Sequence, residues 1–150
     1  MKTLDYLRGI YAPCDFLEWA RSRPRHRRQL HALWQDCPRG DWMLWLVRWD
    51  PEPDLAGIVA AAHACAMLAH DYAAGSTHVA RTYADAATVC AASATRRFAS
   101  SAADEAANAV RCAANAAAFS THSADADTIV AAQRDCADMV RLLVREPVMP

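Results

Sequence analysis

Glycine and lysine are scarce in this sequence, which has four glycines and a single lysine in 150 residues. The glycines stand far apart, so the chain has neither a P-loop nor the glycine-rich turn of a dinucleotide-binding fold. No long stretch alternates between apolar and polar residues, which is the pattern of a half-buried strand. These absences argue against a phosphate-binding α/β fold and against a fold built on β-sheets.

The signatures of catalytic metal sites are also missing, because the sequence contains no HExxH motif and no CxxC pair. His63, Cys65, His70 and Asp71 cluster in one helix-like stretch. The two histidines, however, are separated by about 10 Å along a helix axis, which is too far for one zinc ion. No serine, cysteine or histidine stands in a known nucleophile motif. We therefore expect a protein that is not an enzyme and that uses no metal and no cofactor.

Long apolar runs are absent too. The most apolar stretch, residues 55–69, is 15 residues long and contains His63, whereas a membrane-spanning helix needs about 20 residues. We expect a buried core helix there. Asp5 and Arg8 interrupt the only apolar segment near the N-terminus, so we expect no signal peptide.

Cysteine is present but never paired in sequence. Small secreted domains that depend on disulfides are shorter and richer in cysteine, whereas free cysteine is among the most buried residue types. We therefore expect reduced cysteines that act as small core residues, in a protein of the cytoplasm. The six positions are Cys14, Cys37, Cys65, Cys90, Cys112 and Cys136.

Alanine is the most abundant residue, at 35 of 150 positions. Because alanine is the best helix former, this composition predicts an all-α protein, and the length fits a single domain, residues 1–150. We expect a compact multi-helix bundle of six or seven helices. It would consist of a lead-in at 1–12, with room for a short helix at residues 4–8, helices rich in tryptophan and arginine at 13–49, and alanine-rich helices at 54–146. Flat alanine faces favour close helix packing, within one chain or between two, so a homo-oligomer stays open.

Helix boundaries can be predicted for much of the alanine-rich part. We expect helices over 55–74, with Asp54 as the N-cap, over 77–95, and from Ser100 or Ser101 to Phe119, and a last helix that ends near Arg145. Proline and acidic residues at 50–54 separate this part from the preceding tryptophan-rich helix.

The segment 39–49 holds three of the five tryptophans. Trp42, Trp45 and Trp49 fall on one stripe of a helix, for which Asp41 is the expected N-cap. We expect Trp42 and Trp45 in the core and Trp49 at a surface edge, beside Asp50 and Glu52. Tryptophan, arginine and nearby acidic residues are common at protein-binding hot spots. We therefore predict that Trp49, Asp50 and Glu52 bind a partner.

The densest charge in the chain is a cluster of arginines. We expect a helix that begins after Ser22, with Pro24 in its first turn, where the helix dipole disfavours positive charge. The cluster is either a solvated helix start or a docking patch for an acidic partner or phosphate, since arginine suits both. The cluster comprises Arg21, Arg23, Arg25, Arg27 and Arg28, and the partner-binding prediction takes Arg23, Arg25, Arg27 and Arg28.

The charge of the chain is uneven, with a net charge of +4 over residues 1–49 and −5 over residues 50–150. This asymmetry predicts a polar molecule with one basic end. The overall net charge of −1 is far from that of a typical nucleic-acid-binding domain, and no RNA or DNA motif accompanies the arginines.

Three segments carry a resemblance to other proteins: Gly40-Asp-Trp-Met-Leu-Trp-Leu46, Ala62-His-Ala-Cys-Ala66 and Arg134-Asp-Cys-Ala-Asp-Met-Val-Arg141. Over residues 15–143 the chain resembles small, alanine-rich, all-helical proteins of bacteria and their phages, some of which are described as immunity proteins of polymorphic toxin systems. The resemblance implies a protein that binds and blocks a partner protein, and it implies no catalytic residues.

Three functions are therefore expected, in descending order. The first is a non-enzymatic protein-binding inhibitor of the immunity type, which blocks a toxin by occlusion. The second is a phage anti-defence protein, similar to an anti-CRISPR, that binds a host defence complex and in which the acidic part could imitate nucleic acid. The third is a nucleic-acid-binding accessory protein that uses the Arg21–Arg28 patch. The first two predict a stoichiometric protein complex, and the third predicts binding that weakens steeply with salt.

Overall fold

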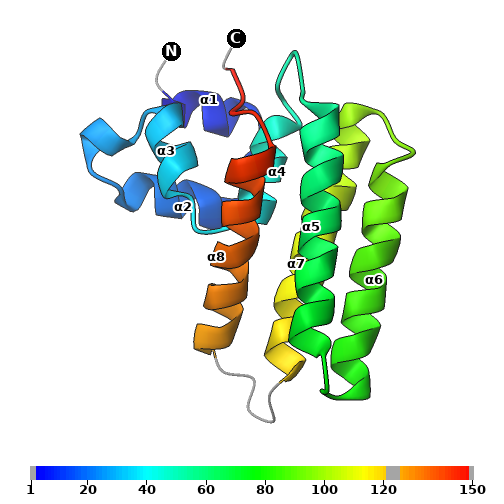
Figure 1. Ribbon diagram of the computed structural model, residues 1–150. Helices are drawn as coiled ribbons and strands as arrows, with labels where there is room; N and C mark the ends of the chain where they lie inside the picture. Colours follow the sequence, from blue (N-terminus) through cyan, green and yellow to red (C-terminus); the bar gives the residue numbers. More distant parts are fainter. Residues whose placement is uncertain (1–2, 121–125, 149–150) are drawn as a thin grey trace.

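The computed structural model describes residues 3–120 and 126–148, which form eight α-helices and one short 3-10 helix without any β-strand (Figure 1). The predicted all-α class is confirmed, although the number of helices exceeds the six or seven expected. The elements are α1 (Thr3–Gly9), α2 (Cys14–Ser22), η1 (Arg25–Arg27), α3 (Leu30–Asp36), α4 (Gly40–Val47), α5 (Leu55–Ala73), α6 (His78–Ala94), α7 (Ala99–Ser120) and α8 (Ala126–Leu143).

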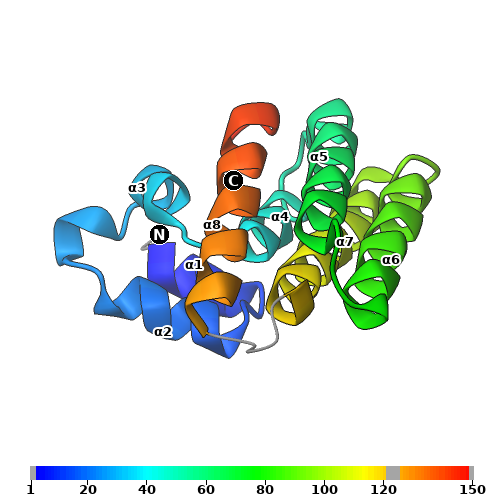
Figure 2. The same cartoon turned by 60° about the horizontal axis from the view of Figure 1, so that its bottom comes forward.

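The long helices α5, α6 and α7 pack on one another in alternating directions, and α4 and α8 cover the other side of α5 and α7 (Figures 1 and 2). The short helices α1, α2 and α3 lie beyond α8 and α4, on the opposite side of the molecule from α6. Helix α7 is the centre of the bundle, because α4, α5, α6 and α8 all contact it. Its buried residues are alanines apart from Val110. The predicted flat alanine faces therefore pack within the chain.

The hydrophobic core has two regions that differ in the size of their side chains. Between α5, α6 and α7 the buried residues are mostly alanines, which allow the helix backbones to approach closely. Where α1–α4 meet α8, the buried side chains are large, and they include Trp34, Phe16 and Met43. Trp42 is buried as predicted, whereas Trp45 is only partly buried and packs against the edge of the core.

Two glycines mark the closest approaches of α8 to its neighbours. A Cβ atom at Gly40 would lie 3.1 Å from the carbonyl oxygen of Cys136. A Cβ atom at Gly57 would overlap with the carbonyl oxygen of Leu143 and with the side chain of Asp54. As predicted, Asp54 is the N-cap of α5: one carboxylate oxygen accepts from the Gly57 amide at 2.9 Å. The other accepts from the amide of Arg145 at 3.2 Å, so one side chain ties the start of α5 to the segment after α8.

The region 22–36 differs from the sequence prediction of one helix that begins after Ser22. Helix α2 continues to Ser22, and both Arg23 and Pro24 are extended, with ψ angles of 147° and 149°. The residue before a proline is driven out of the helical region by contact with the proline ring. The arginines therefore lie in an extended turn and in η1, and α3 begins only at Leu30.

The short helix considered for residues 4–8 of the lead-in is present as α1, which is one residue longer at each end and contains a fully buried leucine, Leu7. Asp41 is not the N-cap of α4, which begins one residue earlier at Gly40; its carboxylate instead binds the side chain of Arg39. The pairing of Asp41 with Arg39 therefore takes the place of the predicted helix cap.

Helix α1 ends at Gly9 and is followed by Tyr11, a bulky residue in the left-handed conformation with a φ of 56°. Two backbone bonds close the helix there, from Tyr11 to Arg8 and from Ala12 to Leu7. This pattern favours glycine at the left-handed position. The ring of Tyr11 is 88% exposed, so little packing offsets the cost of the conformation.

Tyr11→Gly should raise the free energy of unfolding by about 0.5–1 kcal/mol. Glycine removes the left-handed strain, and this gain exceeds the cost of the extra entropy that glycine gives the unfolded chain. Tyr11→Ala, which keeps a Cβ atom, should leave stability close to that of the wild type. Chemical denaturation of the three proteins measures the difference. A loss of stability in Tyr11→Gly would show that the exposed ring contributes contacts that outweigh the strain.

Helix α5 is the one helix in the described ranges that is long and apolar enough to cross a membrane by length and composition. Core helices of soluble proteins have the same length and composition. Here Ile58, Cys65 and Ala69 are fully buried against neighbouring helices, which is the core position predicted for this stretch.

Candidate functional site

Most of the arginine cluster is engaged in contacts within the chain. Arg23 and Arg27 both pair with Asp36, with nitrogen–oxygen distances of 3.0 Å and 3.7 Å. Arg28 donates to the carbonyl oxygens of Arg23 and Arg21 at 2.7 Å and 2.5 Å. Of the four arginines predicted to bind a partner, only Arg25 has a side chain without a partner among the described residues. The structure therefore does not present the cluster as one free basic patch.

Arg25 and Arg28 instead line a cleft of about 640 Å³ between α1 and the segment that contains η1. The opposite wall comes from α1 and includes Thr3, Asp5 and Arg8. Sequence reasoning missed these α1 residues, because residues 1–12 were expected to be a lead-in and nothing local links them to the arginine cluster.

The second predicted group, Trp49, Asp50 and Glu52, is only partly at the surface. Trp49 is 40% exposed at the edge where it was expected, and the guanidinium carbon of Arg48 lies 5.7 Å from its ring centre. Asp50 is only 7% exposed, and its carboxylate accepts from the Glu52 amide at 3.0 Å. Burial, and after it the Asp50 charge, raises the pKa of the Tyr6 phenol. The structure thus exposes Trp49 and Glu52 and buries Asp50.

The end of α4, next to Trp49, and the connection between α6 and α7 lie at the same end of the bundle. At the upper end of the bundle in Figure 1, α4 ends, α5 begins and α6 passes into α7. Phe98, in that connection, is 90% exposed, and Arg48 pairs with Asp104 of α7 at 3.0 Å. We use the name Trp49–Phe98 end for the exposed residues of these segments, namely Arg48, Trp49, Leu55, Arg96, Arg97 and Phe98.

Arg96 and Arg97, which precede Phe98, are exposed and have no side-chain partner in the described part of the chain. Sequence reasoning did not select them or Phe98. The signal in the sequence was a pair of arginines before a single phenylalanine in a helix connection. Only the fold shows that this connection lies at the same end of the bundle as Trp49.

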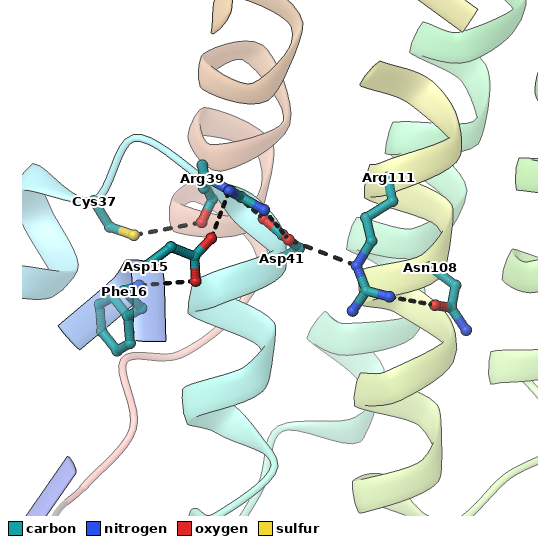
Figure 3. A network of polar contacts seen from close by, with 7 residues as sticks. All are labelled: Asp15, Phe16, Cys37, Arg39, Asp41, Asn108 and Arg111. Atoms are coloured by element: carbon teal, nitrogen blue, oxygen red, sulfur yellow. Dashed lines mark hydrogen bonds and ion pairs between the residues drawn. The ribbon is translucent and has the colours of Figure 1, made fainter. Parts of the chain in front are cut away.

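A network of charges centred on the buried Asp41 joins α2, α4 and α7 (Figure 3). The guanidinium group of Arg39 binds both carboxylate oxygens of Asp41 at 3.0 Å and 2.7 Å, and it also reaches Asp15 at 3.0 Å. Arg111 of α7 lies 3.6 Å from the same Asp41 carboxylate. Arg39 also stacks over the Trp42 ring at 4.4 Å. Every charge in this network is balanced, which suits a structural role.

The two histidines of α5, His63 and His70, are hydrogen-bonded to threonines in α6 and at its C-terminal end. His63 lies 3.2 Å from Thr95 and His70 lies 2.9 Å from Thr88. Each threonine hydroxyl donates to the carbonyl oxygen four residues earlier, so each histidine Nε2 must donate to the threonine oxygen. These pairs join α5 to α6. Within residues 3–120 and 126–148, no group of three or more histidine, cysteine or acidic residues could hold a metal ion.

The cysteines are free thiols and mostly occupy interior positions. Burial raises the pKa of Cys37 to about 12. The hydrogen bond with Cys65, followed by burial, raises the pKa of Cys136 far above its usual range. Thiols with raised pKa values are poor nucleophiles at neutral pH. Cys14 differs from the predicted core role, because it is exposed.

Comparison of the chain with known protein families, with curated proteins and with solved structures found no match. The resemblance to immunity proteins therefore stays a prediction.

Proposed function

We propose that the protein is a non-enzymatic inhibitor that binds a partner protein and blocks it by occlusion, through the Trp49–Phe98 end. The observation that carries this proposal is the exposure of Phe98 beside unpaired arginines, at the same end of the bundle as Trp49. Tryptophan and arginine are the side chains most enriched at binding hot spots, and an exposed large aromatic ring commonly serves as an anchor.

Contacts within the α4 part of this end support occlusion as the mechanism. Trp49 packs near Trp45, with ring centres 6.1 Å apart, and the Arg48–Asp104 pair ties the end of α4 to α7. A preorganised surface loses little conformational entropy on binding, so more of the contact energy appears as affinity.

The charge of the surface indicates the chemistry of the partner. Arg96 and Arg97 have no acidic partner within the described residues, and Arg48 retains an exposed side chain. An acidic surface on the partner would pair with these groups and would accelerate association. We therefore expect an acidic partner protein with an apolar depression that accepts Phe98.

The immunity-type inhibitor is the first form of this proposal, and the phage anti-defence protein is its alternative. Both need a protein-binding surface without catalytic groups, and they differ only in the identity of the partner. The accessory nucleic-acid-binding function has less support, because Asp36 pairs with two arginines of the Arg21–Arg28 patch.

The test is capture of the tagged protein's partner from a host lysate, with and without nuclease, followed by reconstitution of the purified pair. The test variant replaces Arg96, Arg97 and Phe98 by alanine. The matched control replaces two exposed arginines and one exposed apolar residue elsewhere, namely Arg81, Arg134 and Met67. We expect an equimolar, nuclease-resistant complex that inhibits the partner, with affinity reduced about 100-fold or more in the test variant only.

Two outcomes contradict the proposal. Capture that disappears after nuclease treatment would indicate nucleic-acid binding. Equal loss of affinity in the test and control variants would show that the partner responds to general charge rather than to the Trp49–Phe98 end.

A further inference from the structure

The cleft between α1 and η1 is separate from the proposed protein-binding surface, because none of its lining residues belongs to the Trp49–Phe98 end. It lies on the side of the molecule formed by α1–α3, whereas the α6–α7 connection lies on the opposite side (Figure 1). Its volume of about 640 Å³ falls within the range of small-molecule sites, about 300–1,000 Å³. Residues from two elements separate in sequence converge on it.

The lining of this cleft has an excess of positive charge. Arg8, Arg25 and Arg28 line it together with one acidic residue, Asp5, which leaves a net charge of +2. Asp5 lies 3.3 Å from Arg8 and offsets that arginine. Arg25 and Arg28 therefore supply the uncompensated charge.

Arg28 is held in position by the chain itself. Its Nε and one terminal nitrogen donate to the carbonyl oxygens of Arg23 and Arg21, and its remaining N–H groups stay free to donate to a ligand. Because backbone contacts fix the guanidinium group before any ligand arrives, little side-chain entropy would be lost on binding. Arg25 has no side-chain partner among the described residues, so it can turn toward the same ligand.

We propose that this cleft binds the phosphate group of a small phosphorylated compound, with Arg25 and Arg28 as its ligands. A phosphate monoester carries a charge of about −1.5 to −2 at neutral pH, which matches the lining, whereas a single carboxylate would leave positive charge unbalanced. Guanidinium groups bind phosphate oxygens through paired hydrogen bonds. The hydroxyl of Thr3 and the amide of Gln29, also in the lining, suit the rest of such a compound.

A nucleic-acid backbone fits this surface less well than a discrete ligand. A protein that follows a nucleic-acid strand needs several free cations along a groove. Arg23 and Arg27, which would extend the row, are both paired with Asp36. Arg25 and Arg28 line a single cleft together with residues of α1 and do not extend along a groove.

The test is titration of the isotope-labelled full-length protein with inorganic phosphate, ribose 5-phosphate, acetate and a single-stranded oligonucleotide, followed by NMR. The variants are Arg25→Ala and Arg21→Ala. Arg21 is the matched control, because it is an exposed arginine at the end of α2 whose side chain does not line the cleft, and its carbonyl oxygen persists in alanine. Thermal melting confirms that both variants fold.

We expect phosphate and ribose 5-phosphate to give saturable shifts in residues 3–8 and 25–29, with acetate much weaker. Arg25→Ala should weaken phosphate binding about tenfold and Arg21→Ala less than about twofold. The proposal is overturned by the absence of saturable shifts at millimolar phosphate, or by equal effects of the two variants. Tighter binding of the oligonucleotide than of ribose 5-phosphate would also overturn it, in favour of nucleic-acid binding. None of these results bears on docking at the Trp49–Phe98 end.

Discussion

Gly57→Ala should lower the free energy of unfolding by about 2–4 kcal/mol, although alanine is the better helix former. The added methyl group would overlap with the carbonyl oxygen of Leu143 and with the carboxylate of Asp54. Relief requires α8 to move away from α5 and the cap of α5 to open, so a packing cost and a capping cost add. Chemical denaturation measures the change.

Gly9→Ala is the matched control for this prediction. Gly9 is also helical, but no atom lies within 4 Å of the position that its Cβ would occupy. There we expect no loss, and a gain of up to about 1 kcal/mol from the higher helix propensity of alanine. Equal stability of Gly57→Ala and the wild type would mean that α5 and α8 are farther apart than described.

Asp41→Ala should cost about 3–5 kcal/mol of stability, because it leaves the half-buried Arg39 without its main partner. Asp41 is 7% exposed and receives two hydrogen bonds from that guanidinium group. Removal of the carboxylate also leaves Arg111 without its contact to α4. The same denaturation experiment measures the loss.

Asp15→Ala removes the other carboxylate that binds Arg39, and it separates burial from pairing. The Asp15 side chain is 54% exposed, so we expect a cost of no more than about 1 kcal/mol. The double variant Arg39→Met with Asp41→Ala should recover part of the loss, since it leaves no unpaired buried charge. The explanation would be contradicted if the stability lost in the double variant equalled the sum of the losses in Arg39→Met alone and in Asp41→Ala alone.

The long helices could be predicted from the sequence because their signals are local. Asp54 and Thr77 precede α5 and α6, and each side chain accepts a hydrogen bond from the first turn of its helix. The segment between α2 and α3 could not be predicted in the same way. There Arg23 and Pro24 are extended, and the helix expected after Ser22 begins only at Leu30.

The candidate site was predictable only where neighbouring residues in the sequence indicate exposure. Trp49 is followed by acidic residues and prolines, which predicted a surface edge, and the structure exposes it. The burial of Asp50 and the pairing of Arg23 and Arg27 with Asp36 depend on the fold around them. Phe98 has no local pattern that marks it, because one aromatic residue in a helix connection is equally consistent with core packing.

Hydrogen exchange of the protein, free and in complex with its purified partner, tests most directly whether the Trp49–Phe98 end is the binding surface. We expect protection on binding to appear in residues 48–55 and 95–104, with the outer faces of α6 and α8 unchanged. Protection confined to α1–α3 or to the outer face of α8, with residues 95–104 unaffected, would contradict the proposal.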